Sequence, residues 1–144
     1  MKLPDVNIFL YAADEFSPRH HAALAWVDET LSGSETVALA WATVLGFIRI
    51  STNSAAFSGA LEPNVALNLV DGWLAQPSVT IVHPTERHAA VLREMLTPVG
   101  TAGNLTSDAH LAALAIEHGA TLCSCDNDFS RFPGLRWEDP LANP

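Results

Sequence analysis

Four aspartates lie in stretches of sequence that would bring them to one edge of a sheet. Asp108 belongs to the first turn of an expected helix, whereas Asp126 and Asp128 follow a short apolar strand over residues 120–123. Asp5 ends an apolar stretch near the start of the chain, which we interpret as another buried strand. In open α/β sheets, ligands bind outside the carboxyl ends of the strands, where helices also begin. The sequence therefore predicts that these carboxylates share one edge.

Carboxylates that are held close together need a reason, because their charges repel and one of them takes up a proton unless a cation is present. A hard divalent cation such as Mg²⁺ or Mn²⁺ binds oxygen ligands and neutralises such a group. A plainer interpretation is that Asp108 favours the dipole at a helix start and that Asp126 and Asp128 form a turn. For Asp108 alone the plainer interpretation is the better one, so the metal hypothesis depends on the acids together.

Helices and strands alternate along the chain and would hold the acids in place. The helix that carries Asp108 ends at Gly119, a residue suited to a helix stop. Asn104, Thr106 and Ser107 are candidate caps at its start. The other expected elements, in chain order, are helix 17–31 capped by Ser17, strand 37–40, helix 41–50, helix 62–75, strand 79–82, helix 85–96 capped by Thr85, strand 120–123 and a short strand around 136–138. We expect a loop over 98–103 and a loose tail over 139–144. This alternation predicts an α/β fold, a three-layer α/β/α sandwich with a central parallel sheet.

Length and composition indicate one domain spanning residues 1–144. The 144 residues, 49% of them hydrophobic, suffice for a substantial core. No apolar run approaches the roughly 20 residues of a membrane helix, and no basic leader indicates a secretory signal. The two cysteines, Cys123 and Cys125, argue against a disulfide framework. We therefore expect a cytoplasmic protein without membrane contact.

The charge of the chain limits how it could bind nucleic acid. A net charge of −9, with one Lys and six Arg, disfavours nonspecific binding to phosphate backbones. A nucleic-acid substrate would then depend on few contacts, and Arg49 is the first candidate. A solvated helix end or a structural ion pair explains Arg49 equally well.

Other chemistries find less support in the sequence. The chain holds no Gly-x-x-x-x-Gly-Lys-Ser/Thr or Gly-x-Gly-x-x-Gly loop for phosphates. A phosphoacceptor receiver domain would need a late lysine, and the one Lys here is Lys2. A Ser or Cys nucleophile lacks a convincing His–Asp arrangement. His110 follows Asp108 by two residues, which turns it away from the acid side of the helix, so we interpret it as structural or as a support behind the site. Metal-assisted phosphodiester hydrolysis is the chemistry that remains.

These stretches carry a family resemblance. The chain resembles PIN-domain nucleases and, more closely, the VapC-type toxins of VapBC toxin–antitoxin pairs. The matching stretches are residues 3–7, 45–53, 104–121, 126–129 and 132–135. They occur in order over nearly the whole chain, and the block over 104–135 is fairly specific, whereas the Asp-x-Asn at the start is not.

The resemblance implies a PIN-like fold and an endoribonuclease that depends on Mg²⁺ or Mn²⁺. The implied metal ligands are Asp5, Asp108, Asp126 and the neighbouring Asp128, of which the first three are catalytic. The candidate substrate contacts are Asn7 and Ser124, which match family positions, together with Arg49. The implied partners are an RNA substrate, a cognate VapB-type antitoxin whose C-terminal segment lies over the active site, and a second copy of the chain in a homodimer.

One position departs from the family pattern. Gly46 stands where many members carry a Glu at the start of the third helix, and no acid lies between Glu35 and Glu62. Either this subgroup works with fewer acids or its activity is weakened. The alternative function is therefore a catalytically weakened PIN-fold module that acts by protein binding.

Overall fold

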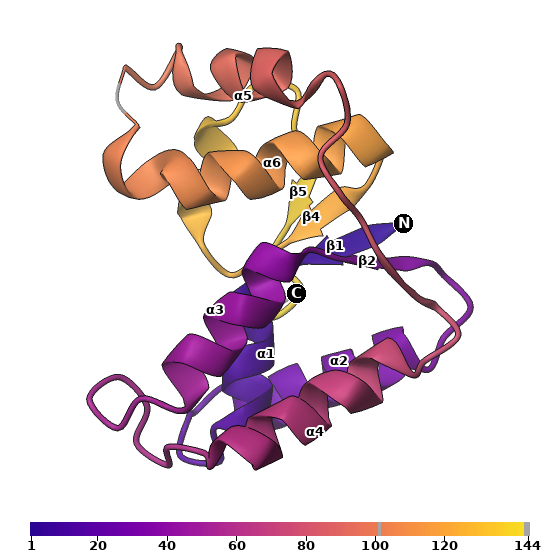
Figure 1. The fold of residues 1–144 in the computed structure, drawn as a ribbon, viewed down its shortest axis with the longest axis vertical. Helices are drawn as coiled ribbons and strands as arrows, with labels where there is room; N and C mark the ends of the chain where they lie inside the picture. The colour runs from indigo at the N-terminus through magenta and orange to yellow at the C-terminus, as the bar shows by residue number, and fades with distance from the viewer. Residues whose placement is uncertain (101, 143–144) are drawn as a thin grey trace.

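The computed structural model describes residues 1–100 and 102–142, and it shows a sheet covered by helices on both faces (Figure 1). The strands are β1 (Lys2–Pro4), β2 (Val37–Leu39), β3 (Val79–Ile81), β4 (Thr121–Cys123) and β5 (Trp137–Glu138). The helices are α1 (Val6–Ala13), α2 (His20–Leu31), α3 (Trp41–Ser51), α4 (Pro63–Leu74), α5 (His88–Leu96) and α6 (Thr106–His118), with 3₁₀ helices η1 (Gly103–Leu105) and η2 (Asn127–Arg131). Among the described residues, no helix combines the length and apolarity that crossing a membrane requires. The expected three-layer α/β/α fold is confirmed.

All strand pairs in the sheet are parallel, in the order β3-β2-β1-β4-β5. The central strand β1 pairs with β4 so that Pro4 lies opposite Cys123. Both strands therefore end at the same level of the same edge. The residues that follow β1 and β4 must meet there, which is the arrangement that the early and late aspartates need.

The two faces of the sheet carry separate cores. Leu3 and Leu122 pack on the face that α5 and α6 cover. Their strand neighbours point the other way, and Cys123 and Leu39 pack against α1, α3 and α4. This alternation follows from the two-residue period of a strand. Because both faces of β2 are buried, this strand is a continuous apolar run in the sequence.

Several helix starts differ from the predictions. The chain turns directly from β1 into α1, a helix that the sequence analysis did not predict, and Asp5 is its N-cap. Helix α2 begins at His20 rather than near Ser17, because the hydroxyl of Ser17 accepts the Arg19 amide in a preceding turn. Helix α5 begins three residues after Thr85. The hydroxyl of Thr85 accepts the Arg87 amide at 3.2 Å in a turn that precedes the helix, while the backbone and hydroxyl of Thr85 donate to Glu117.

The helix that carries Asp108 has the predicted end but not the predicted cap. Gly119 adopts the left-handed conformation with φ of 67°, as its assignment as a helix stop requires. At the other end, η1 leads directly into α6, and no side chain caps the helix. Residue 101 of the expected loop and residues 143–144 of the expected tail lie outside the described part of the chain.

Candidate metal centre

Three peptide segments bring acidic side chains to the carboxyl edge of the sheet. Asp5 follows β1 directly, and Asp126 follows β4 after a two-residue connection. Asp108 comes from the first turn of α6, on the other side of the same edge. Asp128 lies in the first turn of η2. The predicted gathering of the four acids at one edge is therefore what the fold produces.

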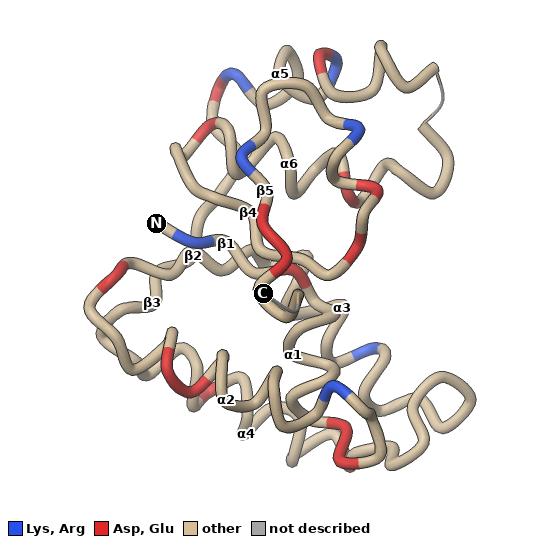
Figure 2. The backbone as a smooth tube through the Cα atoms, turned by 180° about the vertical axis from the view of Figure 1, so that it is seen from behind, with Lys and Arg blue, Asp and Glu red and all other residues tan. Residues whose placement is uncertain are grey.

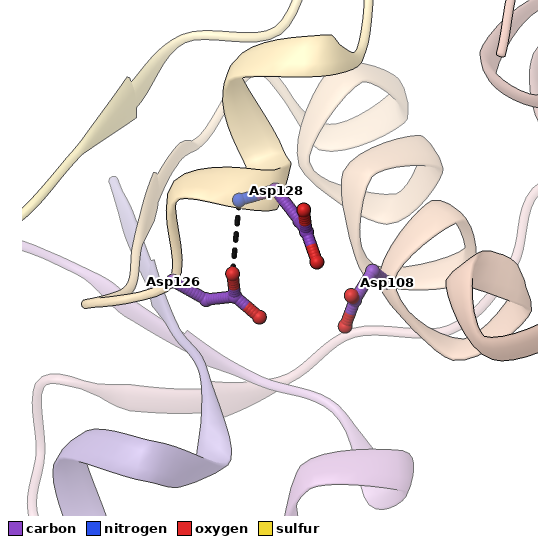
Figure 3. A group of neighbouring side chains, drawn as sticks. All are labelled: Asp108, Asp126 and Asp128. Carbon is purple, nitrogen blue, oxygen red and sulfur yellow. Dashed lines mark hydrogen bonds between the residues drawn. The ribbon is translucent and has the colours of Figure 1, made fainter.

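Three of these carboxylates converge on one point. Asp108, Asp126 and Asp128 each offer an oxygen such that all these atoms lie within 4.8 Å of one another (Figure 3). The turn that holds the last two is stabilised by Asp126 itself, which accepts the Asp128 amide at 2.9 Å. The backbone of η2 thus fixes two carboxylates against the one that α6 presents.

Asp5 lies beside this cluster and, unlike Asp108, is held by hydrogen bonds to both of its carboxylate oxygens. The side chain is buried, and each carboxylate oxygen already accepts a hydrogen bond, from the amide of Val6 at 2.7 Å and from the hydroxyl of Ser124 at 2.9 Å. Burial raises the pKa of Asp5 in spite of these bonds, and the charge of Asp126 adds to the effect. Asp5 is therefore an electrostatic neighbour of the cluster that is anchored from behind.

Ser124 connects these segments through a fully buried hydroxyl. It donates to Asp5 and accepts from the amide of Asp126 at 3.0 Å and from the side-chain nitrogen of Asn7 at 3.0 Å. The side-chain oxygen of Asn7 has no partner among the described residues. Both residues were expected to contact substrate, but the hydroxyl of Ser124 is enclosed and committed to its neighbours. Its geometry is that of a tie between β1 and the Asp126 turn.

The neighbouring acids raise the affinity of Asp108 for protons. The pKa of Asp108 is raised from 3.8 to about 6, first by burial and then by the charges of Asp5, Asp126 and Asp128. The basic side chain that pairs with the cluster is Arg131, which lies 4.0 Å from Asp128, and an exposed pair of this kind compensates little of the repulsion.

The donor set fits a hard divalent cation. Carboxylate oxygens are the ligands that Mg²⁺ and Mn²⁺ prefer, and a Mg²⁺ ion keeps several waters beside one or two carboxylates. A cation among Asp108, Asp126 and Asp128 would remove the repulsion that raises the pKa of Asp108. The carboxyl of Asp5 could add charge to such a site without leaving its hydrogen bonds.

A pocket of about 400 Å³ opens next to the acids. It reaches from Asp5 and Asp108 along one side of α3 to Gly46 and the exposed Arg49. Gly46 lies in the middle of α3 rather than at its start, and it faces the same space as the two acids. The tube in Figure 2 shows the lysines and arginines at separate places along the backbone.

A second polar cluster lies between α5 and α6, away from the acids. Nδ1 of His88 lies 2.5 Å from Glu117, and Nε2 of His88 lies 2.9 Å from Nδ1 of His110. Burial and the neighbouring His88 lower the pKa of His110. His110 is thus a structural residue that ties two helices, in line with the first of its two expected roles. Sequence reasoning missed its partner His88, because the two residues lie 22 positions apart.

The comparisons with known proteins give a consistent picture. A model of the PIN domain matches residues 2–135. Ribonuclease VapC37 of Mycobacterium tuberculosis is 48% identical over 142 residues, which cover 99% of this chain and 99% of that protein. Ribonuclease VapC33 of the same species is 38% identical over 141 residues, covering 98% of this chain and 99% of that protein.

The fold is also similar to solved structures. The complex of VapBC2 from Rickettsia felis with a promoter DNA fragment contains a chain that superposes with a TM-score of 0.68, covering 95% of this chain and 96% of that one at 20% identity. At that identity the likeness concerns the fold alone.

Proposed function

Because the chain belongs to the PIN-domain family, as one of its VapC-type members, we propose that it is an endoribonuclease that hydrolyses RNA with a divalent cation. In this proposal it is the toxin of a type II toxin–antitoxin pair. The sequence matches nearly the full length of two relatives that are named ribonucleases, and this supports the activity.

The observation that carries the proposal is the convergence of Asp108, Asp126 and Asp128 (Figure 3). Two of these carboxylates sit on a rigid turn and the third on a helix, so the cluster is held by backbone structure rather than by flexible side chains. A protein that only needed polar residues at this edge would gain nothing from placing three like charges within 4.8 Å. A bound cation gives the arrangement its physical reason.

Each residue of the site has a distinct role in this proposal. Asp108, Asp126 and Asp128 hold Mg²⁺ or Mn²⁺, which supplies Lewis-acid activation and compensates the negative charge of the phosphodiester. Asp5, the fourth predicted ligand, adds its negative charge to the site, and both of its carboxylate oxygens keep lone pairs with which they can contact the cation. Ser124 fixes Asp5 and the Asp126 turn relative to each other, and so sets the spacing of the carboxylates.

Substrate contacts are assigned to the open side of the site. Arg49 lines the pocket beside Asp5 and Asp108, where its guanidinium can pair with an RNA phosphate that lies next to the cation. Asn7 presents an unpartnered side-chain oxygen near the same edge. We assign Asn7 and Ser124 to the positioning of the acids, and Arg49 to the substrate.

A partner protein would find an apolar groove between α1, α2 and α4. A hollow of about 520 Å³ between α1, α2 and α4 is lined by Phe9, Leu24, Leu69 and Trp73. Leu24 and Leu69 are each more than a third exposed. Apolar surface of this kind marks protein contacts, so we assign the groove to the VapB-type antitoxin.

Helix α3 offers a second apolar surface. Trp41 is 47% exposed and Leu45 is 60% exposed, and both lie on the helix that borders the acidic site. A large aromatic residue and a leucine on one exposed helix are typical of the centre of an interface. We assign this surface to a homodimer. The RNA substrate implies that the protein acts in the cytoplasm.

The alternative function, a binding module without catalysis, makes a different prediction for this edge. Such a module would have no use for the repulsion among the acids, and Gly46 would be a lost ligand. It would bind its partner equally well after the cluster is neutralised, whereas the enzyme requires the carboxylates.

Cleavage of total cellular RNA tests the proposal. The purified chain, free of antitoxin, is incubated with RNA in Mn²⁺ or Mg²⁺, and fragment ends are mapped by sequencing. The controls are EDTA, Asp108→Asn, and Asp28→Asn, which changes an exposed aspartate on α2. We expect discrete cuts with the wild type and with Asp28→Asn, and none in EDTA or with Asp108→Asn. An absence of cuts by the folded wild type, or full activity of Asp108→Asn, would contradict the proposal.

A further inference from the structure

The residues that line the pocket beside the acids are of two chemical kinds. Asp5 and Asp108 are acidic, and Asp108 also belongs to the metal cluster. Val6, Ile50 and Leu111 are apolar. A volume of about 400 Å³ lies within the range of about 300–1,000 Å³ that small-molecule sites occupy. The pocket therefore has room for an organic group next to the place where a phosphate would meet the cation.

Gly46 leaves this pocket open, although its backbone conformation does not require a glycine. Its φ is negative, since the glycines with positive φ are at other positions, so an L-residue could adopt its conformation. An added Cβ would lie 3.6 Å from Cγ2 of Val6, which is an ordinary contact. Glycine is one of the least favourable residues in a helix interior. A glycine that neither the backbone nor close packing requires, on the wall of a pocket, indicates that the space itself is used.

Two further residues of the pocket lack partners. Arg49 carries the one positive charge among the described residues that line it, and no ion pair is found for Arg49 in the described chain. Thr43 is buried in the same wall, and its hydroxyl has no hydrogen-bond partner among the described residues.

We propose that the pocket over Gly46 seats the base of a nucleotide next to the scissile phosphate, with Arg49 facing the neighbouring phosphate. This inference deepens the proposed ribonuclease function and rests on it. A nucleotide matches this lining, because its flat and largely apolar base suits the apolar residues and its phosphate suits Arg49. A cation alone would leave the apolar walls unused, since hard cations require oxygen ligands.

The matched variants come from two glycines that both lie inside helices. Gly46→Ala adds one methyl group to the pocket, and Gly46→Leu fills more of it. Gly72→Ala is the control, because Gly72 lies exposed in α4 and a Cβ there meets nothing within 4 Å. Both alanine variants should raise the Tm by about 2 °C, since each replaces a helical glycine. The melts show that any loss of function is not a loss of folding.

Binding is measured by fluorescence anisotropy with two labelled RNAs in Ca²⁺, a cation that carboxylates also bind. One probe is a decamer of randomised sequence, and the other is a decamer whose nucleotides are all abasic. We expect the wild type and Gly72→Ala to bind the first probe about tenfold more tightly, as expected when an apolar group fills its pocket. Gly46→Leu should reduce this preference to less than twofold. Equal binding of both probes by the wild type, or an unchanged preference in Gly46→Leu, would overturn the inference.

Cleavage separates this inference from the proposed function. An RNA oligonucleotide centred on a mapped cut is made with a single abasic nucleotide on either side of the scissile phosphate. One of the two should lower kcat/KM of the wild type by about tenfold and leave that of Gly46→Leu unchanged. If the wild type cuts in Mn²⁺ but neither abasic position matters, the pocket assignment is wrong and the ribonuclease stands. If total RNA is not cut at all, the proposed function is wrong, and the binding comparison still decides whether the pocket takes a base.

Discussion

Replacing Asp108 by Asn should stabilise the metal-free protein at neutral pH. The pKa of Asp108 is raised from 3.8 to about 6 by burial and by the other acids. At about 1.4 kcal/mol per pKa unit, this shift corresponds to about 3 kcal/mol of destabilisation. Because the side chain is only partly buried, solvent screening reduces the penalty to about 2 kcal/mol. Asn also loses the attraction of the charge to the start of α6, up to about 1 kcal/mol. The net gain of about 1 kcal/mol corresponds to about 2–4 °C in Tm.

The pH dependence of this gain follows from the direction of the pKa shift. The folded protein holds the Asp108 proton more tightly than the unfolded chain, so stability falls as the pH rises from 3.8 through about 6. Below that window the carboxyl is protonated in both states and the penalty is absent. The advantage of Asp108→Asn should therefore be full above about pH 7 and should disappear near pH 4.

Thermal unfolding in EDTA measures the destabilisation by the charge of Asp108, and unfolding in Mn²⁺ measures the stabilisation by a bound cation. A cation at 100 times its Kd stabilises the folded wild type by about 2.7 kcal/mol, and Asp108→Asn should lose most of this. The order of the two melting temperatures should thus reverse between EDTA and Mn²⁺. Asp28→Asn, at an exposed position on α2, should follow the wild type in both. The reasoning is refuted if Asp108→Asn melts below the wild type in EDTA at neutral pH, or if Mn²⁺ raises both equally.

Three other substitutions test the surroundings of the site. Ser124→Ala should lower the free energy of unfolding in urea by about 1–3 kcal/mol, because buried Asp5 loses its hydrogen-bond donor. The control is Ser130→Ala, which removes an exposed hydroxyl. If both variants change the stability equally little, Ser124 does not link Asp5 to the Asp126 turn. His88→Ala should cost about 1–3 kcal/mol of stability through its lost bonds to α6, with RNA cleavage unchanged in a gel assay, and a loss of cleavage by a folded variant would place the histidines in the site. Gly119→Ala should cost about 1 kcal/mol in the same urea assay because of its φ of 67°, and no change would contradict the strain argument.

The sequence was sufficient for the edge of the sheet and for the end of α6. The apolar runs before Asp5 and Asp126 predicted strands, and parallel strands bring their carboxyl ends together whatever the rest of the fold does. Gly119 marked the end of α6 because a left-handed residue favours glycine at that point. These features depend on local pattern, so no tertiary information was needed.

Features that depend on distant contacts were not predicted. Thr85 was expected to cap a helix, but its hydroxyl accepts the Arg87 amide in a turn before α5 and also donates to the distant Glu117 of α6. Ser124 carries a hydroxyl of the kind that can contact a substrate, yet the fold buries this hydroxyl between β1 and the Asp126 turn. The open space at Gly46 is visible only when Val6 and α3 are placed side by side.

Anomalous diffraction from crystals soaked in Mn²⁺ shows directly whether the carboxylate cluster holds a divalent cation. We expect an anomalous peak among Asp108, Asp126 and Asp128 in the wild type. In Asp108→Asn crystals soaked in the same way, the peak should be weak or absent. A well-ordered cluster without a peak in the wild type, or a peak that Asp108→Asn leaves unchanged, would show that these carboxylates do not form the metal site.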